Sequence, residues 1–539
     1  MDQAPARVPA VSGPGPATVP NRDRSGGDRD PAARPGRARW GPRSYGAGGE
    51  AGQAGLPRGR LRGQRRARAQ PRRVRDLEHR REWHGSTRYR DAARAVSTGG
   101  IVISPQRRLD ILDALRRGTV PGRGLETFAV GLERFERSVA EDLAAVERGA
   151  GTFKAIRGEY GSGKTFFVRW LQEQALRRGF LAAEVQISEA ETPLHRLETV
   201  YRRMIERLMT SDCGHGALRS VIDRWLYVLE EDVLAAGGGS SASEAELVAR
   251  TDTLLEQRLA PLARTTPAFA TALRGYRSAT VRGDRALADG ILAWLGGQPS
   301  VGAAIKREIG VKGDVDHFAA LGFIQGLLVA ARDAGHPGLL IVLDEVETLQ
   351  RVRRDVREKA LNALRQWIDE IDGGRFPGLF LVITGTPSFF DGPQGVQVLP
   401  PLSQRLATHF DTDPRFDNPR AVQIRLRNFD LPSLAEVGRK VREIFVAHAA
   451  EAERVRRAVD DDYVVALATA VTGKLGGKVG VAPRMFLKKL VAEVLDRVEL
   501  YPDFDPRRDY ALTLNEHDLS PIERQAMGAS HPDEIDLDL

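Results

Sequence analysis

Cysteine and long apolar runs are the features that this sequence most clearly lacks. Cys213 is the single cysteine in 539 residues, which excludes an internal disulfide and a cysteine-rich metal site. No run reaches the roughly 18 apolar residues that a membrane-spanning helix needs. No apolar stretch follows the N-terminus, so the sequence predicts no secretory signal. We therefore expect a cytoplasmic protein without a membrane partner.

Lysine is absent from residues 1–100, which contain 22 arginines against 9 acidic residues, a net charge of +13. The whole chain carries +8, which leaves −5 for residues 101–539. The high isoelectric point therefore belongs to the N-terminal segment, and the remainder is mildly acidic. This division weakens the inference from isoelectric point to nucleic-acid binding.

The N-terminal hundred residues are rich in Arg, Gly, Ala and Pro and have almost no aliphatic clusters. Such a segment cannot bury enough apolar surface to offset its ordering entropy, so we predict a disordered tail over residues 1–100. Three interpretations stay open. The segment is a basic arm that contacts nucleic-acid phosphates, a solvated tail, or the product of a wrongly assigned start codon in a GC-rich genome. In the last case the authentic start lies near Val96 or Val102.

An octapeptide in the next segment fits the phosphate-binding pattern G-x-x-x-x-G-K-[ST]. It consists of Gly158, Glu159, Tyr160, Gly161, Ser162, Gly163, Lys164 and Thr165. An alternating apolar run precedes it and a helical pattern follows it, so the motif lies between a strand and a helix. Glycines let backbone N–H groups wrap phosphates, and the positive end of the helix dipole faces the anion. Lys164 would reach the β- and γ-phosphates and Thr165 would ligate Mg²⁺, so we expect ATP and Mg²⁺ as cofactors.

The rest of the chain alternates between strand and helix patterns. Strands are predicted at residues 152–157, 181–187, 339–343, 379–384 and 422–426. This alternation predicts an α/β fold of P-loop NTPase type, with a parallel sheet flanked by helices. The ATPase domain would span residues 101–430 and include a helical insert at about 194–335. A helical lid would follow over residues 431–500, and a C-terminal tail over residues 501–539.

Two capping boxes mark helix starts in this pattern. Ser243 with Glu246 would open a helix of the insert, directly after a flexible glycine-rich break at residues 237–241. Ser433 with Glu436 would open the first helix of the lid.

Two acids, Asp344 and Glu345, end the buried-strand run Leu339–Leu343. Asp344 would help to hold Mg²⁺ without binding the ion directly, and Glu345 would polarise the attacking water. The alternative is a capped helix start, since acids favour helix N-termini. The position of the pair at the carboxyl end of a parallel strand, downstream of a phosphate loop, favours the catalytic interpretation.

Polar and basic residues further along the chain complete the candidate site. Thr384 and Thr386, at the tip of the next strand, are candidates for sensing the γ-phosphate and holding the water, and Thr386 is slightly favoured over Thr384. Ordinary turn chemistry is the alternative for both. Arg405 would insert into a neighbouring subunit's site, with a surface salt bridge as the alternative. Arg484, in the first turn of the last lid helix, would swing onto the γ-phosphate when the lid closes.

Taken in order, these motifs resemble an AAA+ ATPase core. The spacing from Ala421 to Arg484 is also similar to the lid of origin-recognition ATPases. That family usually adds a winged-helix DNA-binding domain, but only about 40 residues follow the lid here and they end acidic. This departure weakens the prediction of sequence-specific DNA binding.

A closer resemblance is to the ATP-binding proteins of BREX bacteriophage-exclusion systems, the BrxC and BrxD type. It is carried by residues 114–121, 124–125, 129–131, 158–167, 192–195, 294–297, 344–347 and 384–387. The length of the body suits the smaller BrxD type. The resemblance implies a cytoplasmic ATPase in an anti-phage complex that includes a DNA methyltransferase and helicase-like proteins.

Three functions compete at this point. The first is an ATP-driven switch or remodeller in a defence complex, forming a homo-oligomer that contacts DNA weakly or indirectly. The second is an origin-recognition-like or transposition-type ATPase that loads onto DNA, which the net charge of −5 disfavours. The third is a nucleotide-binding scaffold that hydrolyses little, which the presence of Glu345 disfavours.

Overall fold

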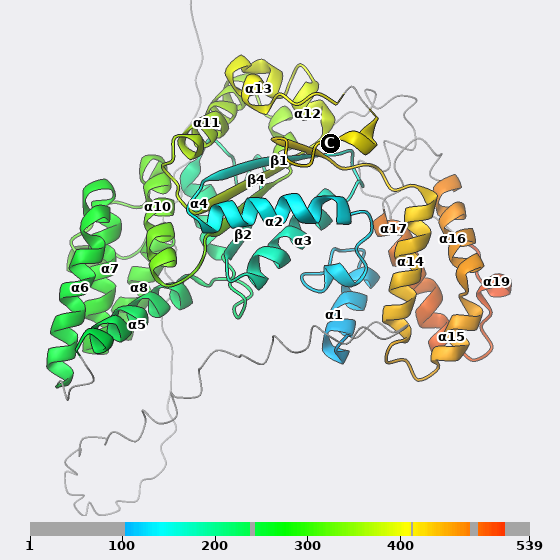
Figure 1. The fold of residues 1–539 in the computed structure, drawn as a ribbon, viewed down its shortest axis with the longest axis horizontal. Coiled ribbons are helices and arrows are strands. Elements are labelled where there is room, and N and C mark those ends of the chain that lie inside the picture. Colours follow the sequence, from blue (N-terminus) through cyan, green and yellow to red (C-terminus); the bar gives the residue numbers. More distant parts are fainter. Residues whose placement is uncertain (1–102, 238–242, 411–412, 475–482, 513–539) are drawn as a thin grey trace, which may run out of the picture. The chain divides into compact units, whose positions relative to one another are not determined.

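Five parallel strands form one sheet in the computed structural model, which describes residues 103–237, 243–410, 413–474 and 483–512 (Figure 1). The strands are β1 (Thr152–Arg157), β2 (Leu181–Gln186), β3 (Leu339–Asp344), β4 (Leu379–Gly385) and β5 (Gln423–Arg425). Their spatial order is β2-β3-β4-β1-β5. The predicted α/β fold with a parallel, helix-flanked sheet is thus confirmed.

Strands β3 and β4 are buried along their whole length, as their continuous apolar composition predicts. Alternate residues point to opposite sides of the sheet. Leu340 and Val382 belong to a core shared with helices α2 (Glu133–Glu147) and α3 (Lys164–Arg177). Ile341 and Leu381 belong to a second core, shared with α10 (His317–Asp333) and α11 (Arg354–Asp372). Because all the strands are parallel, their carboxyl ends lie together at one edge of the sheet.

A set of helices separates β2 from β3 in the chain, at the position predicted for the helical insert. In the described ranges these are α4 (Leu197–Glu206), α5 (Leu218–Ala236), α6 (Glu244–Thr265), α7 (Pro267–Arg282), α8 (Arg285–Leu295), α9 (Ala303–Glu308) and α10. Tyr201, Phe269 and Trp294 each make an edge contact with the ring of Phe323, with centroids 5.2–5.8 Å apart. Ser243 caps α6 by accepting the Glu246 N–H, as predicted. Most of the predicted glycine break lies outside the described residues.

The C-terminal helices pack together (Figure 1), and their core is continuous with the core that contains Leu340 and Val382. They are α14 (Leu431–Val446), α15 (Ala452–Ala458), α16 (Asp461–Lys474), α17 (Pro483–Lys488), the π-helical η7 (Lys489–Leu495), α18 (Asp496–Leu500) and α19 (Pro506–Asp509). The first described helix, α1 (Pro105–Arg116), packs against α14, α17 and η7. Arg116 secures this contact with two 2.8 Å hydrogen bonds to the Asp496 carboxylate.

The capping box predicted at Ser433 is wrong. The N-cap of α14 is Asp430, whose carboxylate accepts a 2.9 Å hydrogen bond from the Ser433 N–H. Pro432 lies in the first turn, where a missing N–H carries no cost, so the helix begins before Ser433.

Short helices complete the chain between these groups: η4 (Val346–Gln350) after β3, then α12 (Pro387–Asp391) and α13 (Pro400–Leu406) after β4. No helix in the ranges that the structure describes is long and apolar enough to cross a membrane. The predicted N-terminal tail, and the C-terminal tail beyond residue 512, lie outside those ranges.

Candidate nucleotide-binding site

The phosphate loop connects β1 to α3, as its sequence context predicts. Gly163 adopts a φ of 90° at the N-cap of α3, a conformation that L side chains rarely take. A Cβ on Gly158 would lie 2.3 Å from the Ser162 Oγ, so the first loop position has no room for a side chain. The backbone path of the loop therefore favours glycine at position 163, and the close approach of the Ser162 side chain favours it at position 158.

Lys164 is buried beneath this loop, with 8% of its surface exposed. Its ammonium donates hydrogen bonds to the carbonyl oxygens of Gly158 at 2.8 Å and Glu159 at 3.3 Å. It also lies 5.0 Å from the centre of the Tyr160 ring, within range of a cation–π contact. The loop thus holds the lysine against its own backbone.

Asp344 joins the loop to the strand ends of β3 and β4. Its carboxylate accepts a 3.2 Å hydrogen bond from the Thr165 hydroxyl and a second one from the Thr384 hydroxyl. Burial raises the pKa of the Asp344 carboxyl, and the hydrogen bond from Thr384 opposes that shift. The sheet order explains the arrangement: β4 lies between β1 and β3, so its tip is next to both the loop and the acid pair.

Glu345 begins the turn after β3 in a left-handed conformation, with a φ of 60°. Non-glycine residues adopt this conformation rarely and often at functional sites. Its N–H is held by the Thr384 hydroxyl at 3.0 Å and by the Asp344 carboxylate at 3.2 Å. Its carboxylate accepts a 2.8 Å hydrogen bond from the Gln186 side-chain amide at the end of β2. Glu345 is therefore positioned from two neighbouring strands.

Glu347 is a third acid at this edge; it lies within the residues that carry the family resemblance, but the sequence predicted no role for it. It is 3% exposed, and its Oε1 lies 3.8 Å from the Lys164 Nζ. Neither carboxylate oxygen has a hydrogen-bond partner on another described residue. Burial raises the pKa of Glu347 to about 7, while Lys164 acts to lower it.

Three predicted residues lie apart from this cluster. Thr386 caps the short helix α12 and shares a 2.9 Å hydrogen bond with the Ser388 hydroxyl, not with Asp344. Arg405 forms an ion pair with Asp369 of α11 and donates to the Pro401 carbonyl at 2.8 Å. Its partners in the described chain thus match the salt-bridge alternative, and its contact with a neighbouring subunit stays a prediction.

Arg484 is exposed in the first turn of α17, as the sequence predicts for a lid residue. Its side chain lies against Gly118, beyond the end of α1, with Nε 3.4 Å from the place of a Cβ at that position. Within the described ranges it forms no hydrogen bond or ion pair, so its swing onto a phosphate stays a prediction.

The family comparison agrees with this geometry. A sequence profile described as BREX system ATP-binding protein BrxC/D matches residues 103–514, more than half of the chain. The chain belongs to this family. The predicted resemblance is thus confirmed, with BrxC and BrxD joined in one profile. No curated protein matches the chain.

The BrxC/D chain offers oxygen ligands suited to a magnesium–nucleotide complex. In the described ranges no group of three or more His, Cys, Asp or Glu side chains could hold a metal by itself. Mg²⁺, however, is commonly bound by one or two protein oxygens together with substrate phosphates. The Thr165 hydroxyl fits that role, and the Asp344 carboxylate, which accepts its 3.2 Å hydrogen bond beside the loop, would orient this ligand without binding the ion directly.

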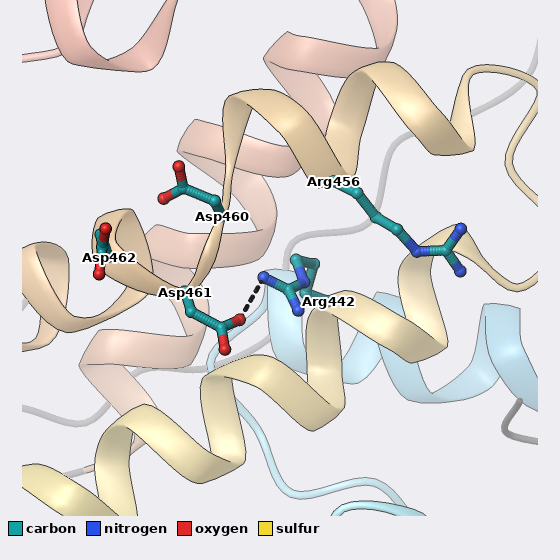
Figure 2. Close-up of a pocket in the computed structure, with 5 residues that line it drawn as sticks. All are labelled: Arg442, Arg456, Asp460, Asp461 and Asp462. Carbon is teal, nitrogen blue, oxygen red and sulfur yellow. Dashed lines mark hydrogen bonds and ion pairs between the residues drawn. The ribbon is translucent and has the colours of Figure 1, made fainter. Parts of the chain in front are cut away.

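A shallow pocket on the lid of this BrxC/D protein is lined by Arg442, Arg456, Asp460, Asp461 and Asp462. Figure 2 shows the Arg442 guanidinium directed at Asp461, with which it forms a 2.8 Å ion pair. Arg456 pairs with Glu443 and Asp460 with Arg507. Because its arginines and Asp460 and Asp461 are engaged in these pairs, the pocket is a network of surface ion pairs outside the nucleotide site.

Proposed function

We propose that this BrxC/D chain binds ATP with Mg²⁺ in the phosphate loop and hydrolyses it as an AAA+-like ATPase. The observation that carries the proposal is the hydrogen-bonded connection from Thr165 through Asp344 to Thr384. It links the loop, the acid pair and the polar tip of β4 at one edge of the sheet. Phosphoryl transfer depends mainly on positioning and electrostatics, and this edge supplies both.

Each residue has a distinct role in the proposal. Backbone N–H groups of residues 158–165 would surround the phosphates, and Lys164 would offset charge on the β- and γ-phosphates. Thr165 and Asp344 would hold Mg²⁺, whose positive charge would stabilise the phosphate oxygens. Glu345, held by Gln186, would polarise the attacking water.

The structure supports Thr384 over Thr386 as the residue that senses the γ-phosphate. Thr384 contacts both Asp344 and the Glu345 N–H, whereas Thr386 contacts Ser388. Thr384 would therefore transmit a change at the phosphate directly to the acid pair.

We further propose a homo-oligomer in which Arg405 completes a neighbour's site and Arg484 acts within its own subunit. Arg405 would have to leave Asp369 for this purpose. Arginine supplied by a second chain is an established way to stabilise charge in phosphoryl transfer.

The biological role we propose is a cytoplasmic switch or remodeller of BrxD type in anti-phage defence. Its partners would include a DNA methyltransferase and helicase-like proteins, with DNA contacted weakly or indirectly. Membership of the BrxC/D family supports the defence role, and the net charge of −5 of residues 101–539 supports weak or indirect contact with DNA. The alternative is a DNA-loading ATPase, which predicts binding of residues 101–539 to duplex DNA with a steep dependence on salt.

A steady-state ATPase assay with and without Mg²⁺ tests the proposal. We expect Mg-dependent turnover by the full chain and its loss in Lys164→Ala, because a charge on the phosphates is removed. Lys359→Ala, which changes an exposed lysine on α11, is the matched control and should hydrolyse ATP normally. Equal turnover by Lys164→Ala and the wild-type chain would contradict the proposed site.

A further inference from the structure

Glu347 has a position that the proposed hydrolytic roles do not explain. It lies on η4, two residues after Glu345, and is almost fully buried. A buried carboxylate is normally hydrogen-bonded, because removing a charge from water is costly. Neither Glu347 oxygen has a hydrogen-bond partner on another residue in the part of the chain that the structure describes. Burial raises the pKa of this carboxyl, and its own backbone N–H acts to lower it. The cation beside it is the Lys164 ammonium, with 3.8 Å between Nζ and Oε1.

The hydrogen bonds that Lys164 already makes determine how the Glu347 carboxylate can act on it. An ammonium has three N–H donors. The carbonyl oxygens of Gly158 and Glu159 take two of them, at 2.8 and 3.3 Å. The third donor is the one that a phosphate oxygen would take. At 3.8 Å, the Glu347 carboxylate is too far for a hydrogen bond but close enough for a strong interaction between charges in a buried place.

The nucleotide phosphates and the Glu347 carboxylate would therefore both interact with the Lys164 ammonium. Phosphates that enter the loop are attracted to the Lys164 ammonium. They are also repelled by the Glu347 carboxylate, whose charge is not screened by water. Tyr160, whose ring lies 5.0 Å from the Lys164 Nζ, contributes no positive charge. Burial already raises the pKa of Glu347, so its environment disfavours the anion before nucleotide arrives.

We propose that Glu347 is a positioning residue that competes with the nucleotide phosphates for Lys164 and thereby lowers the affinity of the loop for nucleotide. This inference rests on the proposed function, in which phosphates bind at residues 158–165. Since the competition is between charges, its effect grows with the charge of the ligand: largest for a triphosphate, smaller for a diphosphate and absent for adenosine. By lowering the affinity, Glu347 would let bound nucleotide dissociate and exchange from a loop that would otherwise bind it tightly.

Nucleotide dissociation constants of the full chain test the proposal. The variants are Glu347→Gln, which keeps the shape of the side chain, and Glu347→Met, which replaces it with an apolar chain of similar length. The probes are a non-hydrolysable ATP analogue, ADP and adenosine, measured by calorimetry with Mg²⁺ present. We expect each folded variant to bind the ATP analogue about tenfold and ADP about threefold more tightly than the wild-type chain, with adenosine unchanged. Glu358→Gln, on α11, removes an exposed carboxylate and should leave all three constants as they are.

The pattern across the ligands separates competition from a general effect on structure. A general change in stability would alter all three constants alike, and a change in loop shape would alter ATP-analogue and ADP binding by the same factor while leaving adenosine unchanged. Either result overturns the proposal. Unchanged or weaker binding of the ATP analogue by the charge-neutral variants also overturns it. If the wild-type chain binds neither phosphate ligand, the proposed nucleotide site fails and the inference fails with it. If the wild-type chain binds them and the variants gain nothing, the inference alone fails.

Discussion

The strand ends of the sheet and the two arginine-bearing helices position their candidate residues differently. At the carboxyl edge of β1, β3 and β4, Thr165, Asp344 and Thr384 are joined by hydrogen bonds within one chain. Among the described residues, Arg405 of α13 pairs with Asp369 and Arg484 of α17 lies against Gly118, and neither contacts the loop. The difference teaches that the phosphate and metal side of the proposed site is assembled by the fold of one subunit. In the proposed mechanism, the arginine side depends on a second subunit for Arg405 and on a movement of the lid for Arg484.

The largest expected effect concerns Arg405 and would sharpen this comparison. Arg405→Ala should lower turnover by about a thousandfold, because an arginine supplied from a second chain stabilises charge in the transition state. Arg365→Ala is the control, since Arg365 pairs with the same Asp369 at 2.9 Å. Mixing Arg405→Ala with Lys164→Ala protein should restore part of the ATPase activity. A mixture no more active than the two separate variants would show that Arg405 does not act across subunits.

A smaller effect is expected from the two threonines at the tip of β4. Thr384→Val should reduce kcat by about tenfold to a hundredfold, because it removes a buried hydroxyl that binds Asp344 and the Glu345 N–H. Thr386→Val is a matched change two residues away and should alter kcat by less than about threefold. Comparable losses in single-turnover assays would argue against the selection of Thr384.

The contact between strands β2 and β3 predicts a more modest change. Gln186→Ala removes the 2.8 Å hydrogen bond to the Glu345 carboxylate, so the acid would lose its orientation. We expect kcat to fall about fivefold with little change in KM, as for one partly exposed hydrogen bond to a charged group. A rise in KM at constant kcat would instead place Gln186 in nucleotide binding.

The smallest effect is on stability and depends on pH. The pKa of Glu347 rises from 4.5 to about 7 on burial, so the folded state holds this proton more tightly than the unfolded state. The stability that the protonated side chain contributes is complete below pH 4.5 and is lost as the pH rises through 7. Glu347→Gln should therefore gain about 1–3 kcal/mol over the wild-type chain between pH 4.5 and 8, measured by urea unfolding without nucleotide. A constant difference across that range would contradict the burial argument.

Much of this arrangement could be predicted from the sequence, because buried strands and the phosphate loop leave strong local patterns. The run before Asp344 predicted a strand end with acids, and the structure has one there. The choice between Thr384 and Thr386 requires knowing at which residue β4 ends, and the local sequence determines the ends of strands and helices only weakly. The Ser433 prediction failed for the same reason, since Asp430 and Pro432 begin α14 earlier.

Contacts across strands could not be predicted, because they depend on the order of the strands. The sequence does not show that β4 lies between β1 and β3, or that β2 pairs with β3. Gln186 is the polar last residue of β2, a signal that becomes meaningful only beside Glu345. Glu347 looks like one more surface acid until the turn of η4 buries it next to Lys164.

The central claim is that one edge of the sheet both binds ATP and hydrolyses it, with Glu345 acting on the water. The most direct measurement is single-turnover hydrolysis by Glu345→Gln, together with its affinity for ATP. We predict ATP affinity within about threefold of the wild-type chain and hydrolysis slower by about a hundredfold or more, as for loss of a general base. Hydrolysis at the wild-type rate by Glu345→Gln would contradict the account.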